Sequence, residues 1–259
     1  MMRFDTITIF PEMFSALTEF GVTSRALKMQ KAQLSLWNPR DYTTDTRRTV
    51  DDRAYGGGPG MVMMVAPLEG ALDAIKQDVA VHHLIAGPTI LLSPQGRLLN
   101  QALVDELGGH SQITLVCGRY EAVDQRFIER RVDFELSLGD FVVSGGEIPA
   151  MMLMDSLIRQ IPGVLGDEQS AEQDSFKNGL LDCPHYTRPE NYENFFVPDV
   201  LLGGHHAKIT DWRRQQALMA TQTRRPDLIE KARRNQWLSP SDEEFLREFE
   251  ENSVKNKLS

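Results

Sequence analysis

Short apolar runs that alternate with helical patterns limit the fold of this chain more than any other feature of its sequence. Three such runs, each closed by a loop that contains glycine, lie at residues 89–92, 113–117 and 134–138. Two further strand patterns occupy residues 4–10 and 34–37. Short strands that alternate with helices are typical of a parallel sheet covered by helices. The sequence therefore predicts an α/β fold built on a parallel sheet.

Helical patterns follow the predicted strands at residues 11–17, 101–107, 122–130 and 148–158. The last pattern is apolar on nearly every side, so we expect this helix to be buried on more than one face. A subunit interface is one way to bury it, and a place inside the core is the other.

Three loops fall at the carboxyl ends of predicted strands, at residues 93–96, 118–121 and 139–146. Ligands of open α/β sheets bind at this edge. The third loop carries Gly145 and Gly146 directly before a helix start, where free N–H groups and close backbone approach favour a polar ligand. A tight turn without a ligand is the alternative for one glycine pair. The convergence of three loops favours a binding site.

Composition excludes several classes of protein. No apolar run approaches the roughly 18 residues of a membrane-spanning helix, and the first residues lack the apolar segment of a signal peptide. Two cysteines, Cys117 and Cys183, are too few for a disulfide scaffold and suit a reducing compartment. We therefore expect a cytoplasmic protein with no membrane contact.

Common site motifs are missing. Cys183 and His185 have no matching second pair, which argues against zinc. Residues 55–60 are rich in glycine but lack the lysine of a phosphate loop, and no Gly-x-Ser-x-Gly or Gly-x-Gly-x-x-Gly motif occurs. The ligand is therefore not predicted to be a nicotinamide cofactor.

The C-terminal part differs in character. Residues 163–176 are polar and acidic, and they predict a mobile linker between a domain at 1–162 and a helical domain at 177–259. Residues 205–235 hold eight basic and three acidic side chains, a local charge of +5 in a chain of net charge −9. With Trp212 among them, these cations suit RNA phosphates and stacking, and a solvated helix face is the alternative.

Five motifs occur in a fixed order along the chain: DDRAYGGGPGM at 51–61, LSPQG at 92–96, CGRYE at 117–121, Gly139-Asp140 with SGGE at 144–147, and DCPHYTRP at 182–189. Together they resemble bacterial tRNA (guanine-N1)-methyltransferases over nearly the whole chain. The resemblance implies a SPOUT fold with a deep trefoil knot, a homodimer with active sites at the subunit interface, and S-adenosylmethionine as methyl donor. It also implies that tRNA is methylated on the guanine immediately 3′ of the anticodon (position 37), assisted by magnesium whose ligands the sequence does not identify.

The chemistry of this reaction requires a base and a cation. Guanine N1 carries a proton that a base must remove, and negative charge then develops towards O6. The resemblance assigns the base to Asp174 and the stabilising cation to Arg159. Taken alone, Asp174 reads as a solvated linker acid, and Arg159 as a favourable charge at a helix C-terminus.

The resemblance also assigns binding residues. Glu121 is expected to face the cationic methionine end of the cofactor, while Leu91 and Phe141 depart mildly from the family pattern. The predicted cofactor contacts are Leu91, Leu92, Gly118, Tyr120, Glu121, Ser137, Leu138, Gly139, Asp140, Phe141, Val142, Val143, Gly145, Gly146 and Pro149. The predicted RNA contacts are Arg188, Lys208, Arg213, Arg214, Arg224 and Arg225.

Two other functions remain open at this point. One is a SPOUT methyltransferase that acts on another RNA base or on ribose, which the motif at 182–189 and the basic helical region disfavour. The other is an RNA-binding relative without activity. Loss of Arg159 or Asp174 would favour that relative, and both residues are present.

Overall fold

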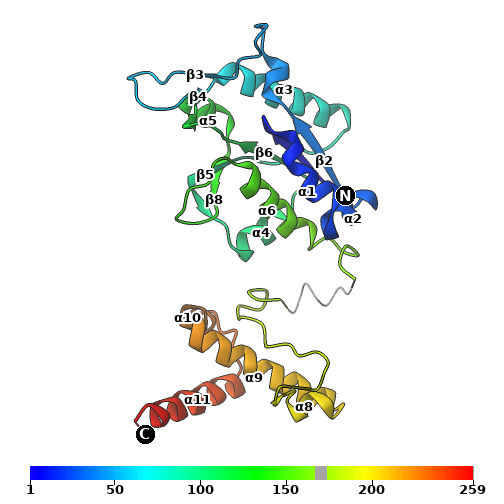
Figure 1. The fold of residues 1–259 in the computed structure, drawn as a ribbon, viewed down its shortest axis with the longest axis vertical. Helices are drawn as coiled ribbons and strands as arrows, with labels where there is room; N and C mark the ends of the chain where they lie inside the picture. Colours follow the sequence, from blue (N-terminus) through cyan, green and yellow to red (C-terminus); the bar gives the residue numbers. More distant parts are fainter. Residues whose placement is uncertain (167–173, 259) are drawn as a thin grey trace. The chain divides into compact units, whose positions relative to one another are not determined.

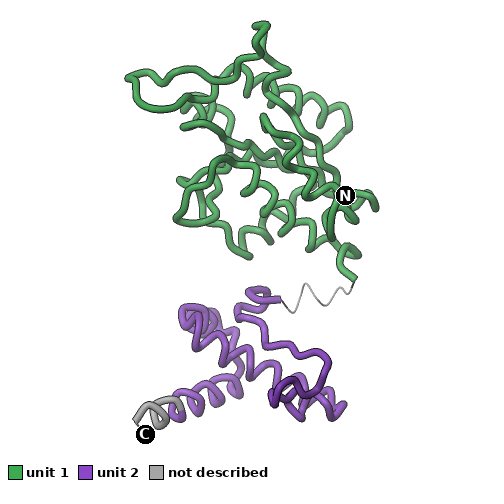
Figure 2. Tube along the Cα trace, viewed as in Figure 1, with its two compact units in different colours: residues 1–166 green, residues 167–259 purple. Residues whose placement is uncertain are grey.

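The chain folds into two compact units, residues 1–166 and 167–259 (Figure 2). The computed structural model describes residues 1–166 and 174–258, and for residues 253–258 it describes the backbone only. Half of the predicted linker, residues 167–173, therefore lies outside the described residues. None of the described helices has both the length and the apolar character needed to cross a membrane.

A five-stranded sheet forms the centre of unit 1 (Figure 1). Its order is β2-β1-β6-β5-β8, and every neighbouring pair is parallel. The strands are β1 (Met2–Ile7), β2 (Ala32–Trp37), β5 (Thr89–Leu98), β6 (Gln112–Cys117) and β8 (Phe134–Ser137). The middle strands β1 and β6 are buried along their whole length, as expected for a parallel sheet covered on both faces. The predicted α/β fold with a parallel sheet is confirmed.

Helices cover both faces of this sheet. The helical segments of unit 1 are η1 (Pro11–Phe14), α1 (Ser15–Glu19), α2 (Gly21–Lys28), η2 (Pro39–Tyr42), α3 (Val65–Val81), α4 (Gln101–Leu107), α5 (Gln125–Arg131) and α6 (Glu147–Ile158). A second, small sheet joins β3 (Asp51–Asp52), β4 (Val62–Met63) and β7 (Ala122–Val123) in the order β3-β4-β7.

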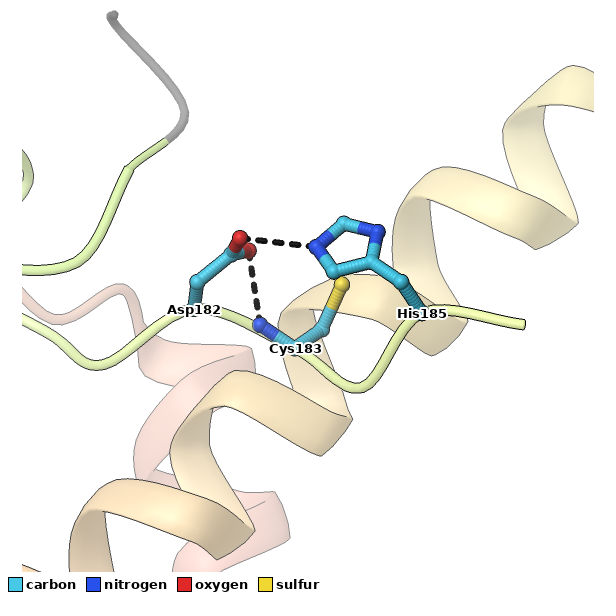
Figure 3. A group of neighbouring side chains, drawn as sticks. All are labelled: Asp182, Cys183 and His185. Carbon is cyan, nitrogen blue, oxygen red and sulfur yellow. Dashed lines mark hydrogen bonds and ion pairs between the residues drawn. The ribbon is translucent and has the colours of Figure 1, made fainter. Parts of the chain in front are cut away.

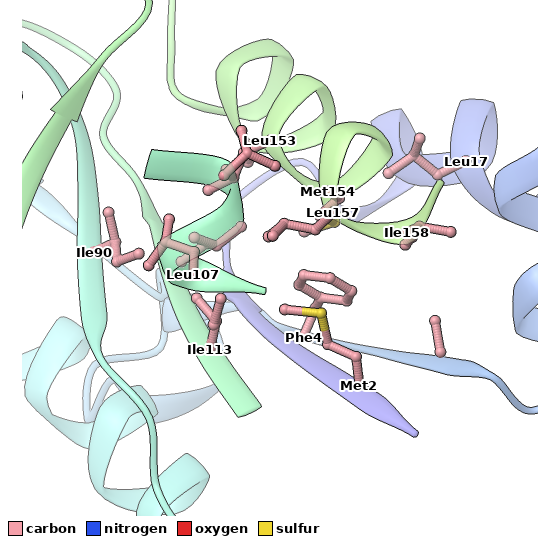
Figure 4. Close-up of a cluster of buried hydrophobic side chains, with 14 of the residues drawn as sticks. Met2, Phe4, Leu17, Ile90, Leu107, Ile113, Leu153, Met154, Leu157 and Ile158 are labelled. Atoms are coloured by element: carbon pink, nitrogen blue, oxygen red, sulfur yellow. The ribbon is translucent and has the colours of Figure 1, made fainter. Parts of the chain in front are cut away.

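Two apolar clusters hold unit 1 together, one on each face. On one face Phe4, Ile113 and Ile90 pack against α4 and α6, with Leu153 and Leu157 among the labelled side chains of Figure 4. On the other face, strand residues that alternate with these pack against α3 and α5. Successive side chains of a strand point to opposite faces, so β1, β5 and β6 each supply both clusters. The sheet is thereby fixed from both sides, and its carboxyl edge is held in place.

A buried polar group ties three strands together. Asp5 of β1 accepts hydrogen bonds from Arg3 (2.7 and 2.9 Å), from Trp37 of β2 (3.0 Å) and from Gln112 of β6 (2.9 Å). Arg3 is 2% exposed and Asp5 is fully buried. A buried carboxylate is tolerated when such donors surround it.

Unit 2 is mostly helical. It contains a hairpin of β9 (Asn191–Tyr192) and β10 (Phe195–Phe196), followed by α8 (Asp199–Leu202), α9 (His206–Arg224), α10 (Pro226–Arg234) and α11 (Pro240–Leu258). Ser239 and Asp242 bond each other's backbone N–H groups at the start of α11, which is a reciprocal capping arrangement. Leu180, Leu218 and Leu246 are buried in its small core.

Several sequence-based boundaries are wrong. Residues 93–96 lie inside β5 rather than in a loop, because the strand continues through an irregularity between Leu92 and Arg97. The helix predicted at 122–130 begins at Gln125, since Ala122 and Val123 pair with β4. The strand predicted at 4–10 ends at Ile7, and the helix at 11–17 is a 3₁₀ turn followed by α1.

Helix α6 is not buried on every side within the chain. Its core face includes Leu153, Met154 and Leu157, whereas Ile148 and Met152 are 46% and 51% exposed. Within a single chain α6 buries its core face, and burial of a second face, which a subunit interface would supply, stays a prediction. The apolar residues on the exposed side leave the subunit-interface alternative open.

Candidate cofactor-binding site

A cavity of about 340 Å³ opens at the carboxyl ends of β6 and β8, beside the irregular middle part of β5. The loops that follow β6 and β8 supply much of its wall, and residues 91–95 of β5 complete it. Its volume falls in the range of small-ligand sites, roughly 300–1,000 Å³. Its position is the edge at which parallel α/β sheets bind ligands.

The cavity brings together thirteen of the fifteen residues that the sequence assigns to the cofactor. Gly139 and Asp140 are the two that do not line it. The lining residues are Leu91, Leu92, Gly118, Tyr120, Glu121, Ser137, Leu138, Phe141, Val142, Val143, Gly145, Gly146 and Pro149. Gly139 still shapes the loop, because its φ of +150° is one that other residues rarely adopt and Phe141 packs against it.

Gly146 lies where two of these loops touch. Its N–H donates to the carbonyl of Gly118 at 2.9 Å. A β-carbon at this position would lie 2.7 Å from the Cα of Cys117 and 3.0 Å from the N of Gly118. Only glycine therefore allows the start of α6 to approach the end of β6 so closely, and this approach forms the floor of the cavity.

An ion pair that the sequence analysis missed joins the same loops. Glu147, in the first turn of α6, is fully buried and accepts hydrogen bonds from Arg119 (2.8 Å) and Thr8 (2.8 Å). Arg119 also donates to the carbonyl of Ser144 (3.2 Å) and lies over the ring of Phe10. A carboxylate in the first helical turn is favoured by the helix dipole. Through its bonds to Glu147 and Ser144, Arg119 connects the loop after β6 to the turn before α6.

We predict that Glu147→Gln weakens cofactor binding. The amide keeps the shape of the side chain but removes the charge that balances the largely buried Arg119. The dissociation constant of S-adenosylmethionine, measured by calorimetry, should rise about tenfold, equivalent to about 1.4 kcal/mol. Glu106→Gln is the matched control, because Glu106 forms a similar pair with Arg97 on the exposed surface. An unchanged constant for Glu147→Gln would mean that other contacts fix the loops.

Tyr120 adopts an unusual backbone conformation at the rim of the cavity. Its φ is +62°, which is uncommon for a residue with a side chain and concentrates at functional sites. Arg40 donates to its hydroxyl at 3.3 Å. Burial and a hydrogen bond with Asp51 raise the pKa of the Tyr120 hydroxyl, so it stays protonated near neutral pH. The N–H of the next residue, Glu121, donates to the carbonyl of Met61, directly before β4, and thereby connects the rim to the small sheet.

The glycine-rich segment at 55–60 borders this rim. The carboxylate of Glu121 lies so close to Gly60 that a β-carbon there would be 2.9 Å from its Oε2. Gly56, Gly57, Gly58 and Gly60 all have positive φ values. The sequence explained these glycines only by family resemblance, whereas their backbone conformations give the physical reason.

The two predicted catalytic residues belong to different units. Arg159 is half-buried and caps the C-terminus of α6, where its N–H bonds the carbonyl of Asp155 at 3.0 Å. Asp174 belongs to unit 2, where its carbonyl accepts from Lys177. Their joint action in one site stays a prediction.

One group of side chains in the described residues has metal-ligand geometry. The ligand atoms of Asp182, Cys183 and His185 lie within 4.8 Å of one another (Figure 3). His185 bonds Asp182 at 2.8 Å, and burial together with the nearby Asp182 raises the pKa of the Cys183 thiol. A raised thiol pKa disfavours the thiolate that zinc requires. One carboxylate among sulfur and nitrogen donors does not fit magnesium, which prefers oxygen ligands.

The predicted RNA contacts all belong to unit 2, and two of them already form ion pairs with carboxylates of the same unit. Arg214 forms a two-point ion pair with the nearly buried Asp242, at 2.9 and 3.0 Å. Arg225 pairs in the same way with Asp227 at 2.6 and 2.8 Å. The exposed ones without a described ion pair are Arg188, Lys208, Arg213 and Arg224. Arg214 therefore serves the fold of unit 2 directly.

Comparison with known proteins decides the family. The family model described as "tRNA (Guanine-1)-methyltransferase TrmD" matches residues 2–231 of the chain. The chain belongs to this tRNA (guanine-1)-methyltransferase family. It is 65% identical over 247 residues to the tRNA (guanine-N(1)-)-methyltransferase of Ralstonia nicotianae, covering 95% of this chain and 92% of the relative. The enzyme of the same name from Polynucleobacter asymbioticus is 61% identical over 246 residues, covering 95% and 99%.

Membership of the tRNA (guanine-1)-methyltransferase family confirms the resemblance inferred from the five motifs. The Cupriavidus taiwanensis relative, of the same name, is 61% identical over 248 residues. Four of the five motifs lie in unit 1, and three of these contribute to the cavity wall. The fifth motif, at 182–189, lies in unit 2 beside the helices.

Proposed function

We propose that this protein transfers a methyl group from S-adenosylmethionine to N1 of the guanine immediately 3′ of the anticodon of tRNA, position 37. The observation that carries the proposal is the cavity at the carboxyl edge of the sheet, lined by motifs of a tRNA (guanine-1)-methyltransferase family. The relatives' names support the reaction, and the cavity supports the proposed binding of the methyl donor.

The cavity suits both the adenine ring and the methionine end of the methyl donor. Leu91, Leu138 and Val143 offer an apolar surface for the adenine ring, and backbone groups of the loops can bond its edge. Glu121 offers a carboxylate at the rim for the positively charged methionine end. The donor, when bound, supplies an activated methyl group on sulfur.

In the proposed reaction, Asp174 takes the proton from guanine N1. The N1 lone pair then forms a bond to the methyl carbon while the bond between that carbon and the donor sulfur breaks, and the donor leaves as a neutral thioether. Arg159 stabilises the negative charge that develops towards O6. Correct positioning of the methyl group and N1 supplies much of the remaining acceleration. A site that combines Arg159 of one subunit with Asp174 of the other would require a homodimer.

An apolar surface beside the cavity supports the homodimer. Phe141, Val142, Ile148 and Met152 are 56%, 83%, 46% and 51% exposed, and all lie in or next to α6 and the loop before it. Large apolar side chains gathered next to a binding site are typical of an interaction surface. We also infer the trefoil knot of the SPOUT class, which the family resemblance implies.

We predict that tRNA affinity depends on the exposed cations of unit 2. The variant that combines Lys208→Gln, Arg213→Gln and Arg224→Gln spares the structural pair of Arg214 and Asp242. Each lost phosphate contact should reduce the slope of log affinity against log salt by about one. Filter binding across a salt series measures this slope.

The control for this variant combines Lys28→Gln, Lys76→Gln and Arg130→Gln, three exposed cations of unit 1. It removes the same charge from the chain, so general attraction between protein and RNA changes equally. Equal effects of both triple variants on the slope would contradict a specific basic surface on unit 2.

Magnesium remains an expectation of the family resemblance alone. The described residues contain no group of three or more candidate ligands that fits it. We propose that magnesium assists activity, and activity measured with and without a chelator tests this.

The proposed function is tested first by ligand binding. S-adenosylmethionine should bind the free protein and raise its thermal midpoint by mass action. Isothermal calorimetry is the measurement. No heat of binding at millimolar cofactor would overturn the assignment of the cavity.

A further inference from the structure

Unit 2 contains a cavity of its own that the proposed catalytic chemistry does not use. Its volume is about 560 Å³, and its walls come from residues 184–188, Glu190, Val197, α8 and α9. All of its walls belong to unit 2. Its volume lies within the range of small-ligand sites, roughly 300–1,000 Å³.

Two aromatic rings form part of the wall. The centroids of Tyr186 and Trp212 are 6.3 Å apart, and their planes are inclined by 55°. The rings therefore do not stack face to face, and Tyr186 is 49% exposed. Such a pair can accept a further flat ring against an aromatic face.

The charges at the same cavity are mainly positive. Arg188 and Arg213 line it and are exposed, and Glu190 is the acidic residue among the lining side chains. His185 also lines it, and its ring is held by the carboxylate of Asp182 at 2.8 Å (Figure 3). Aromatic faces beside guanidinium groups are the combination that recognises single-stranded nucleotides, with bases on the rings and phosphates at the arginines.

We propose that this cavity binds one unpaired nucleobase of the bound tRNA against Trp212 and Tyr186, with the neighbouring phosphates at Arg188 and Arg213. The base must be unpaired, because bases inside a duplex do not expose their faces to a side chain. The inference rests on the proposed function, which makes tRNA the ligand. It adds a second nucleotide-binding position, separate from the cavity assigned to the methyl donor.

The test combines protein and RNA changes. Wild-type enzyme and Trp212→Ala are titrated, as full-length protein, with a tRNA anticodon stem-loop and with versions that carry one abasic nucleotide at each loop position in turn. Loss of one stacked base should lower affinity about 5- to 150-fold, which corresponds to about 1–3 kcal/mol. One abasic position should weaken binding to wild type but cause no further loss with Trp212→Ala. This non-additivity identifies direct contact between that base and the ring.

Three controls separate this proposal from others. Trp237→Ala removes a tryptophan of unit 2 that is 49% exposed and does not line the cavity, so it should leave affinity unchanged. Trp212→Phe keeps a flat ring and should restore most of the loss. If Trp212→Ala lowers the thermal midpoint, Tyr186→Ala, whose ring is half exposed, replaces it in the same cycle.

Additive losses at every abasic position, or unchanged affinity in both aromatic variants, would overturn the nucleobase proposal. Failure of the wild-type enzyme to bind the unmodified stem-loop or tRNA would instead contradict the proposed function. Loss of affinity that follows Arg213→Gln but not Trp212→Ala would assign the cavity to phosphate alone, and would also overturn the nucleobase proposal.

Discussion

Asp174→Ala is expected to slow methyl transfer by about 10²–10⁴-fold in single-turnover measurements, the usual effect of losing a general base. The cofactor dissociation constant should barely change, because Asp174 is not among the residues that line the cavity of unit 1. A rise in pH should partly restore the rate, since hydroxide can then remove the N1 proton. Asp199→Ala, an exposed acid of unit 2, is the control. A near-normal rate for Asp174→Ala would remove Asp174 as the base.

Mixed dimers test whether the site is shared between subunits. Asp174→Ala and Arg159→Lys homodimers should both be slow, because lysine keeps the charge of Arg159 but lacks its planar pair of donors. A heterodimer of the two variants should keep one intact site and about half of the wild-type activity. A heterodimer as inactive as its parents would contradict independent sites built from two subunits.

Gly146→Val is expected to abolish measurable binding of S-adenosylmethionine. The β-carbon alone would lie 2.7 Å from the Cα of Cys117, a backbone atom that no side-chain rotation can move. The start of α6 must therefore shift away from β6, which breaks the hydrogen bond from Gly146 to Gly118 and deforms the cavity. Calorimetric titration with the cofactor measures the effect.

A matched control is available at Gly109, in the turn that follows α4. A β-carbon at Gly109 would meet nothing closer than 3.4 Å, and this residue is remote from the cavity lining. Gly109→Val should keep cofactor affinity. If Gly146→Val keeps full affinity while remaining folded by circular dichroism, the methyl donor binds elsewhere.

The central sheet was largely predictable from the sequence, because its strands are short apolar runs that end at glycine-containing loops and alternate with helical patterns. Residues 113–117 correspond to β6 within one residue, and α4 matches the predicted helix at 101–107. The pattern failed where tertiary contacts decide the structure. Ala122 and Val123 have helical neighbours in sequence but pair with β4, a partner about 60 residues away. The long helix α3 escaped prediction although it buries Leu68, Leu72 and Ile75 at helical spacing.

The candidate site was predictable where glycine loops and motifs marked it. Its supporting contacts were not, because they join residues far apart in the chain. Thr8 and Glu147 are 139 positions apart, and no local pattern links them. The cavity at Tyr186 and Trp212 was missed for the same reason, although Trp212 had drawn notice among the basic residues. Arg214 was assigned to RNA because it belongs to a cluster of basic residues. In the structure it forms an ion pair with Asp242 inside unit 2.

The most direct test of the proposed function is methylation of unmodified tRNA transcripts by the full-length protein with radiolabelled S-adenosylmethionine, followed by mapping of the labelled nucleotide. A transcript in which adenine replaces the guanine 3′ of the anticodon serves as the control. The proposal predicts label on N1 of that guanine alone and no label in the control transcript. Label on another nucleotide, on ribose, or on the control transcript would contradict it.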